Sequence, residues 1–210
     1  MTRLLLFIKH RLPFIWGGID WVNAVLFRLL HGDRLEKEAE RCFREFTLPG
    51  YHFRELSDGD LDQLASLLSR QKAGRLDYFK PHGFDRKSLK RAVRNPSFLM
   101  FGAFSDDLLV GYFFLRCFWN RKCFVGRLID EPYERKGIGR VMNQILYNTA
   151  WRSEFRCLTT VSKHNALVMR SHANNSTFHV LKELPNDYLF VEFVKPNSER
   201  NLKPRDRGTA

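Results

Sequence analysis

Residues 124–142 read Phe124-Val-Gly-Arg-Leu-Ile-Asp-Glu-Pro-Tyr-Glu-Arg-Lys-Gly-Ile-Gly-Arg-Val-Met142. The apolar, strand-like start of this stretch is joined through a basic turn to a helix predicted over Lys136–Trp151. Gly137 and Gly139 allow the backbone to approach a ligand closely. The first N–H groups of the helix have no intrahelical acceptor and lie at the positive end of the helix dipole. The junction is therefore suited to bind a phosphate group.

The glycine spacing excludes two common phosphate-binding motifs. Gly137-Ile-Gly139 is followed by Arg140, Val141 and Met142, so the Gly-x-Gly-x-x-Gly motif of dinucleotide-binding folds is absent. The Gly-x-x-x-x-Gly-Lys-Ser/Thr pattern of P-loops is absent as well. An ordinary strand, turn and helix with glycines in the turn is the structural alternative to a phosphate site.

A longer pattern carries a family resemblance. Ile129-Asp-Glu-Pro-Tyr-Glu-Arg-Lys-Gly-Ile-Gly139 resembles the coenzyme A loop of the GNAT superfamily of acetyltransferases, in which Arg/Gln-x-x-Gly-x-Gly/Ala follows a strand and a Pro/Tyr turn. Glu134 stands where Arg or Gln is usual, and Arg135 where Gly is common. The resemblance implies acetyl-CoA as co-substrate, held mainly by backbone amides. The implied cofactor-binding residues are Leu128, Ile129, Asp130, Arg135, Lys136, Gly137, Ile138, Gly139, Arg140 and Asn165.

The C-terminal half resembles the same superfamily in the order of its parts. A strand is predicted over Cys157–Ser162, a helix follows Asn165, and strands over Phe178–Leu184 and Tyr188–Val194 form a closing hairpin. Seven residues after this Asn, the family commonly has a Tyr that protonates the departing thiolate. In this sequence the position is His172, and the Gly-Phe pair that usually follows the helix is missing. The resemblance implies His172 as the catalytic acid.

The part of the chain that resembles the superfamily is one domain over residues 47–195. A strand over Tyr51–Leu56 precedes an amphipathic helix that begins near Ser57. Further elements are predicted as a helix over 85–94 and strands over 98–104, 108–118 and 121–129. Strands on both sides of helices in this order predict a mixed, largely antiparallel α/β sheet flanked by helices.

Residues 1–46 precede this domain as an apolar and helical extension. A helix over Ile19–Leu30 is apolar nearly all round and is predicted to end at Gly32. Neither this helix nor the shorter apolar run Leu4–Ile8 is long enough to span a membrane. Residues 1–32 pack on the domain or on a second subunit of a homodimer, or they contact a membrane peripherally; packing is favoured because the helix lacks a strongly charged face. Residues 196–210 are polar and basic, which predicts a disordered tail.

Length and composition limit the classes of cofactor and partner that this chain could bind. A chain of 210 residues, 44% of them hydrophobic, is long enough for one buried domain. The four cysteines and seven histidines show no metal-ligand spacing, so no metal site is predicted. Without a recognisable signal sequence, we expect reduced cysteines and a cytoplasmic protein. The net charge of +12 suits phosphate-rich ligands or a membrane surface; no nucleic-acid-binding motif accompanies it, so nucleic acid is not predicted.

Acetyl transfer from a thioester to an amine needs a donor for the carbonyl oxygen, a base for the amine and an acid for the thiolate. The resemblance assigns the first task to a backbone N–H at Leu128, Ile129 or Asp130. Asp130 and Glu131 are the candidate bases, although a carboxylate at a strand end is often a turn cap. His172 is the better acid or base, and a surface histidine is the alternative.

The acceptor is predicted from Leu76–Phe84, between the first two helices, where the family builds its acceptor pocket. Tyr78, Phe79 and His82 are the candidate substrate-binding residues. Rings with a basic rim suit a nucleotide-linked amino sugar, as in superfamily members associated with cell-envelope polysaccharide biosynthesis. Three alternatives remain: the rings belong to the core, the acceptor is a peptide or protein bound in an acidic groove, or the chain is a non-catalytic acyl-CoA-binding module at a membrane.

Overall fold

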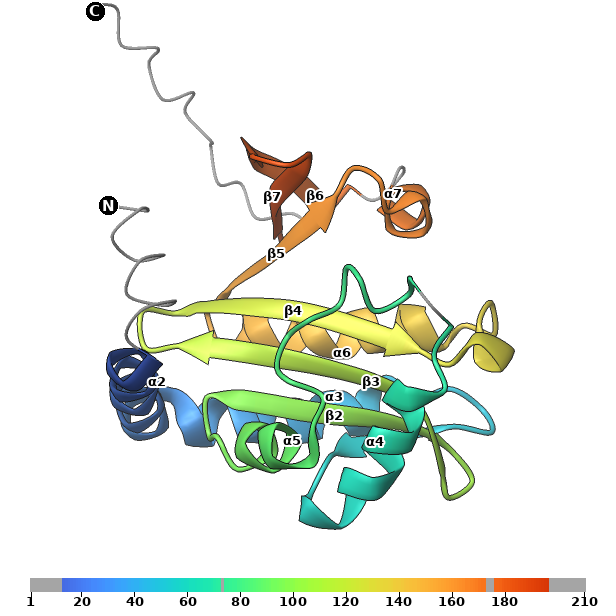
Figure 1. Cartoon of the computed structure of the whole chain (residues 1–210), viewed down its shortest axis with the longest axis horizontal. Helices are drawn as coiled ribbons and strands as arrows, with labels where there is room; N and C mark the ends of the chain where they lie inside the picture. Colours follow the sequence, from blue (N-terminus) through green and yellow to red (C-terminus); the bar gives the residue numbers. More distant parts are fainter. Residues whose placement is uncertain (1–12, 73, 173–175, 197–210) are drawn as a thin grey trace, which may run out of the picture.

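The computed structural model describes residues 13–72, 74–172 and 176–196. These residues form one seven-stranded sheet with the order β1-β2-β3-β4-β5-β7-β6 (Figure 1). All neighbouring strands are antiparallel except β4 and β5, which are parallel. The mixed, largely antiparallel sheet predicted from the sequence is therefore confirmed. The strands are β1 His52–Glu55, β2 Phe98–Ser105, β3 Leu108–Phe118, β4 Lys122–Ile129, β5 Arg156–Ser162, β6 Phe178–Leu184 and β7 Tyr188–Phe193.

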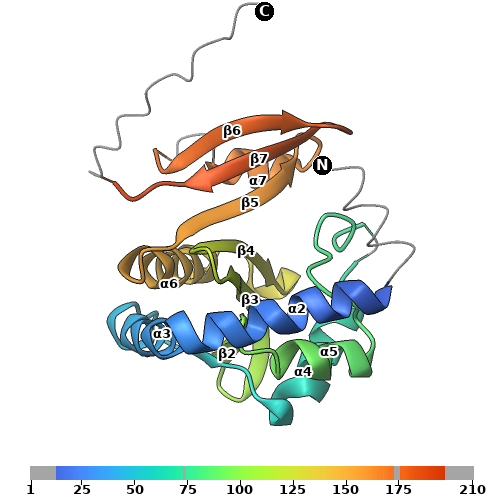
Figure 2. The same ribbon diagram turned by 90° about the vertical axis from the view of Figure 1, so that its left-hand side faces the viewer.

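Helices cover both faces of the sheet (Figures 1 and 2). The α3 and α6 helices lie on one face, and α4 and α5 lie on the other. The helices predicted over 85–94 and 136–151 are confirmed, with ends that differ by one or two residues. The helix predicted to begin near Ser57 starts with a short turn at Asp58–Asp60 and continues as α4 Leu61–Ser69. The helices are α2 Pro13–Phe27, α3 Asp33–Glu45, α4 Leu61–Ser69, α5 Arg86–Val93, α6 Ile138–Arg152 and α7 Ala166–His172, with short turns of helix at Arg28–Gly32, Asp58–Asp60 and Glu131–Tyr133.

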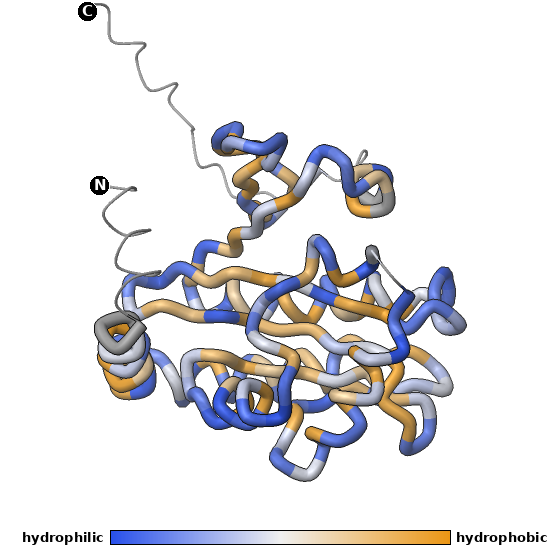
Figure 3. Tube along the Cα trace, in the orientation of Figure 1, coloured by the Kyte–Doolittle hydropathy of each residue, from blue (hydrophilic) through white to orange (hydrophobic). Residues whose placement is uncertain are grey.

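The β3 strand lies in the middle of the core, which has one part on each face of the sheet. Phe113 and Leu115 are buried against the α3 and α6 side, whereas Tyr112 and Phe114 are buried against the α4 and α5 side. Because both faces of β3 are covered, the strand is an apolar run without alternation. Figure 3 shows this concentration of apolar residues along the central strands.

The β4 and β5 strands pair only at their beginnings. Lys122–Phe124 of β4 lies beside Arg156–Leu158 of β5, and beyond this register the two strands diverge (Figure 1). One further contact is the Thr159 hydroxyl, which donates to the Val125 carbonyl at 3.2 Å. The β5 strand continues instead as the partner of β7. The second half of β4 therefore has β3 on one edge and an open gap on the other.

The predicted helix stop at Gly32 is wrong. Gly32 has right-handed backbone angles, φ −52° and ψ −57°, and the chain passes through a π-helical turn from α2 directly into α3. A Cβ at Gly32 would lie 2.9 Å from Cδ of Arg28. Glycine at this position therefore permits the close approach of the Arg28 side chain and does not provide a left-handed helix end.

Cys117 of β3 is directly opposite Cys123 of β4 across the hairpin, and all four cysteines are free and buried. Among the described residues, none of the helices combines the length and the apolar character that a membrane crossing requires. The predictions for residues 1–12 and for the tail beyond Pro196 lie outside the described residues.

Candidate functional site

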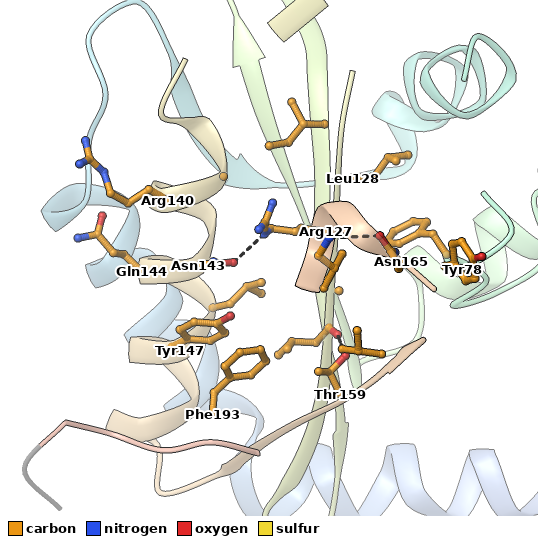
Figure 4. Close-up of a pocket in the computed structure, with 18 of the residues that line it drawn as sticks. Tyr78, Arg127, Leu128, Arg140, Asn143, Gln144, Tyr147, Thr159, Asn165 and Phe193 are labelled. Atoms are coloured by element: carbon orange, nitrogen blue, oxygen red, sulfur yellow. Dashed lines mark hydrogen bonds between the residues drawn. The ribbon is translucent and has the colours of Figure 1, made fainter. Parts of the chain in front are cut away.

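A cavity of about 980 Å³ occupies the gap between β4 and β5 (Figure 4). Its floor comes from β4, one wall from α6, and the opposite wall from β5 and the start of α7. Arginines are its only described charged residues apart from Glu134. Its polar and charged side chains include Arg75, Arg127, Glu134, Arg135, Arg140, Asn143, Gln144, Asn148, Thr159, Thr160, Ser162 and Asn165, and its aromatic ones are Tyr78, Phe79, Tyr147, Trp151 and Phe193.

The glycine turn forms one end of the cavity. Arg135 and Gly137 adopt left-handed backbone angles, with φ of 60° and 90°, and α6 begins immediately afterwards. No described side chain caps this helix. The first intrahelical donors are the N–H groups of Arg140 and Val141, which both bond to the Gly137 carbonyl. The N–H groups just before them lie at the positive end of the helix dipole, as an anion site requires.

Arg127 brings a cation to the same end of the cavity. It lies in β4, and its Nε donates to Oδ1 of Asn143 in α6 at 2.8 Å (Figure 4). A Cβ built on Gly139 would lie 2.9 Å from Nη1 of Arg127 and 3.1 Å from Cδ1 of Ile129. No carboxylate among the described residues forms a salt bridge with Arg127, and burial lowers the pKa of its guanidinium. The charge is therefore partly desolvated and has no salt bridge to a described carboxylate, although Glu134 acts on it from a longer distance.

Glu134, which departs from the family pattern, is neutralised by a residue distant in sequence. Its Oε1 lies 2.6 Å from Nη2 of Arg75, which also donates to the carbonyl of Ile129 at 2.9 Å. Both partners are about three-quarters buried, with exposed side-chain fractions of 24% and 23%. The carboxylate therefore does not face the glycine turn as an isolated negative charge.

Of the three amide donors predicted in β4, only the N–H of Ile129 faces the gap between β4 and β5. The N–H of Asp130 donates to the Val110 carbonyl of β3 at 2.9 Å, so it faces away from the gap. Because N–H groups point to alternate sides along a strand, the amide of Leu128 faces β3 as well. The carbonyl of Ile129 faces the gap, where it accepts from Arg75, and the N–H of Ile129 points to the same side.

Asp130, one of the two candidate bases, is held in a buried ion pair. Its carboxylate is buried, with Oδ2 2.6 Å from Nε of Arg70 and Oδ1 3.1 Å from Nε2 of Gln71. The side chain is not among the described residues that line the cavity. Glu131, the other candidate base, pairs with Lys72 and is exposed. These carboxylates tie the end of β4 to the segment after α4, and the Asp130 side chain does not cap the turn that follows it.

The predicted acceptor residues separate into two groups. Tyr78 and Phe79 line the cavity, but His82 does not. The His82 ring makes edge-on and tilted contacts with Phe84, Phe98 and Tyr112, and its Nε2 lies 2.8 Å from the Tyr112 hydroxyl. Burial lowers the pKa of His82, so the ring is neutral, accepts from Tyr112 at Nε2 and donates to the Gly83 carbonyl at Nδ1. His82 supports the loop that carries Tyr78 and Phe79.

Other predicted site residues differ in what they can contribute. Asn165 lines the cavity, and its Oδ1 accepts from the N–H of Val168 in the first turn of α7. Lys136 lies over the Tyr133 ring at 4.7 Å, and Ile138 is buried in the core, so neither side chain lines the cavity. The α7 helix ends at His172, whose side chain lies outside the described part of the structure.

Sequence reasoning missed Arg127, Arg75 and Asn143. Arg127 carried a signal, because it is the only charged residue between Phe124 and Ile129 in a strand whose neighbours are apolar or glycine. No sequence signal pointed to Arg75 or Asn143, because each depends on a partner distant in the sequence: Arg75 on Glu134, 59 residues away, and Asn143 on Arg127, 16 residues away. The described residues contain no group of histidines, cysteines and carboxylates that could hold a metal ion.

The arrangement of the sheet, the gap and the glycine turn is that of the GNAT acetyltransferase fold. Similar solved structures are the PaiA N-acetyltransferase from Thermoplasma acidophilum in complex with coenzyme A (TM-score 0.58, 18% identity, covering 69% of this chain and 99% of that one) and the ribosomal-protein-S5-alanine acetyltransferase from Vibrio fischeri (0.60, 15%, 72% and 97%). A third is YncA, a putative acetyltransferase from Salmonella typhimurium with acetyl-CoA (0.55, 15%, 71% and 96%). No protein-family model and no curated protein matches the sequence.

Proposed function

We propose that this chain is an acetyl-CoA-dependent N-acetyltransferase whose catalytic domain comprises residues 47–195. The observation that carries the proposal is the divergence of β4 and β5 over a cavity that ends at the glycine turn of Gly137 and the uncapped start of α6. A strand with an open edge can pair with the amide groups of a pantetheine arm. The helix start and Arg127 provide the positive charge for its pyrophosphate.

The reaction requires an amine nitrogen to attack the thioester carbonyl, forming a C–N bond while the C–S bond breaks. The Ile129 N–H faces the gap and donates to the carbonyl oxygen as it gains negative charge. The ion pair with Arg70 keeps the Asp130 carboxylate from acting as the base. The amine therefore loses its proton to solvent, directly or through a bound water. The thiolate gains a proton, and the family resemblance assigns that step to His172.

The finer part of the proposal is a nucleotide-linked amino sugar as the acceptor. A peptide acetyltransferase is expected to have an acidic groove for a cationic amine terminus. Here Glu134 is the only acidic residue among the described lining, and it is paired with Arg75. Tyr78 and Phe79 provide rings for a base, and the arginines suit its phosphates. The buried free cysteines suit a reducing compartment, so we place the activity in the cytoplasm.

Calorimetric titration with coenzyme A tests the cofactor site. We expect Gly137→Glu and Gly139→Glu to abolish binding, because a carboxylate and its bulk would occupy the phosphate site. At Gly137 the φ of 90° also disfavours any side chain, so a circular-dichroism melt must accompany the titration. The matched control is Gly59→Glu, the same substitution at an exposed glycine far from the cavity. Unchanged affinity in both cavity variants would refute the proposed cradle.

A thiol-release assay tests the acceptor. Acetyl-CoA is supplied with a panel of nucleotide-linked amino sugars, the corresponding free amino sugars, and peptides with free N-termini. The aromatic and basic lining predicts turnover with the nucleotide-linked sugars and little with the other two. Turnover confined to peptides would overturn the sugar assignment and leave the acetyltransferase intact. Coenzyme A binding without turnover of any amine would favour a non-catalytic acyl-CoA-binding module.

A further inference from the structure

The α2 helix directs its polar residues toward the protein. Asp20 lies 3.3 Å from the Arg116 guanidinium of β3. Asn23 donates to the carbonyl of Cys117 at 3.1 Å and accepts from the N–H of Trp119 at 3.1 Å. These bonds dock the helix on the end of the β3–β4 hairpin. The sequence prediction that this segment packs on the domain is therefore right for one face of α2.

The opposite face of the same helix is apolar and uncovered. Trp21 is 68% exposed and Leu29 is 77% exposed. In Figure 2 the helix runs across the near side of the molecule, with no described element over it. A surface helix normally has the reverse arrangement, with apolar residues inward and polar residues toward water. The exposed large apolar residues of this segment are Ile19, Trp21, Val22, Val25, Leu26, Leu29 and Leu30.

The sequence that leads into this face is basic, and the acidic residues Asp33 and Glu36 that follow it are paired with Arg28. Residues 1–12, which lead into α2, contain the apolar run Leu4–Ile8 with Arg3, Lys9 and Arg11, and no acidic residue. The only acidic residue of α2 is Asp20, which is paired with Arg116. A second copy of the chain has the same net charge of +12 and does not supply the opposite charge. A surface of anionic lipid headgroups supplies the opposite charge and an apolar layer beneath it.

We propose that the exposed apolar face of α2 and of the turn Arg28–Gly32 after it binds the surface of an anionic lipid bilayer. The helix lies in the plane of the headgroups, with Trp21 and Leu29 inserted and the protein body above it. An isolated interfacial helix needs its own charged face. In this chain the folded domain provides the polar side, because Asp20 and Asn23 are already bonded to β3 and the hairpin.

Co-sedimentation of the full chain with vesicles tests this proposal. With vesicles of three parts phosphatidylcholine to one part phosphatidylglycerol, we expect binding that weakens in high salt. The double variant Trp21→Ser/Leu29→Ser should bind at least about tenfold more weakly, because two large apolar side chains no longer enter the lipid. The control is Leu108→Ser, which removes an exposed leucine at the opposite end of β3 and should bind as the wild type does.

Two further measurements make the outcome decisive. Replacing Arg3, Lys9 and Arg11 with Gln should weaken binding to the anionic vesicles without changing the melting temperature. Sedimentation velocity without lipid should show a monomer. A lipid-free dimer that the Trp21→Ser/Leu29→Ser variant dissociates would overturn the proposal in favour of a second copy, and wild-type protein that ignores the vesicles would overturn it outright. The proposal is independent of acetyl transfer, since coenzyme A binding should be equal in all variants.

Discussion

Replacement of Arg127 by Met is the sharpest test of how the cavity recognises its ligand. Met keeps much of the apolar stem and removes the charge and the bond to Asn143. If the guanidinium contacts a phosphate, the variant loses at least one charge-assisted hydrogen bond, worth about 1.5–3 kcal/mol. Because about 1.4 kcal/mol corresponds to a tenfold change in affinity, the dissociation constant for coenzyme A should rise by about 10- to 150-fold.

Although Arg127→Met should weaken coenzyme A binding, it should leave the stability of the ligand-free protein unchanged or raise it. Arg127 is a partly buried cation without a carboxylate partner among the described residues, and burial lowers its pKa. Removing a desolvated charge relieves an unfavourable contribution to folding. We therefore expect an unchanged or higher melting temperature for Arg127→Met without ligand. A purely structural arginine would give the opposite result, a clear loss of stability.

The assay is calorimetric titration with two ligands. Coenzyme A contains the phosphates, and pantetheine contains the same thiol arm without them. Arg127→Met should weaken the first and leave the second unchanged, whereas Arg127→Lys should recover part of the loss. Arg140→Met is the matched control, because Arg140 lines the same cavity from an exposed position and its loss should matter less. Equal affinities of wild type and Arg127→Met for coenzyme A would refute the reasoning.

Three further predictions concern other residues. His172→Ala should lower turnover by roughly 10²- to 10⁴-fold with little change in acetyl-CoA affinity, and a loss below about fivefold in steady-state kinetics would make it a surface histidine. Arg75→Met should weaken coenzyme A binding, because it leaves Glu134 unpaired at the glycine turn. Adding Glu134→Gln should restore the affinity. A titration in which the double variant binds coenzyme A no more tightly than Arg75→Met would contradict this prediction. The bonds from Arg54 and Ser57 lower the pKa of Asp60 to about 2, so its ion pair stabilises the fold above the ordinary pKa and is lost as the pH falls toward 2. Asp60→Asn should therefore cost about 1–2 kcal/mol at pH 7, after allowance for the half-exposed Arg54, and the difference from wild type in urea unfolding should shrink below about pH 4; a difference that is constant with pH would exclude the ion pair as its source.

The sequence by itself determined the local structure of this protein. The run from Phe124 to Met142 predicts a strand, a turn and a helix because its apolar periodicity and its glycines act over a few residues. The order of elements then predicts the sheet, and the positions of Gly137 and Gly139 predict where an anion would bind. Tyr78 and Phe79, predicted to bind the acceptor, line the cavity because their loop packs on β3 and β4; their role stays a prediction.

Only the tertiary structure decided which of these residues meet. It placed Asp130 in an ion pair with Arg70, neutralised Glu134 with Arg75, and aimed Arg127 at the start of α6. It also turned the polar side of α2 inward, although its sequence reads as apolar nearly all round. Periodicity fixes which side chains share a face of a helix or strand, but the partner of that face is set by packing between segments far apart in the chain. For that reason the glycine turn could be predicted from the sequence, whereas the arginines that the fold brings to it, Arg75 and Arg127, could not.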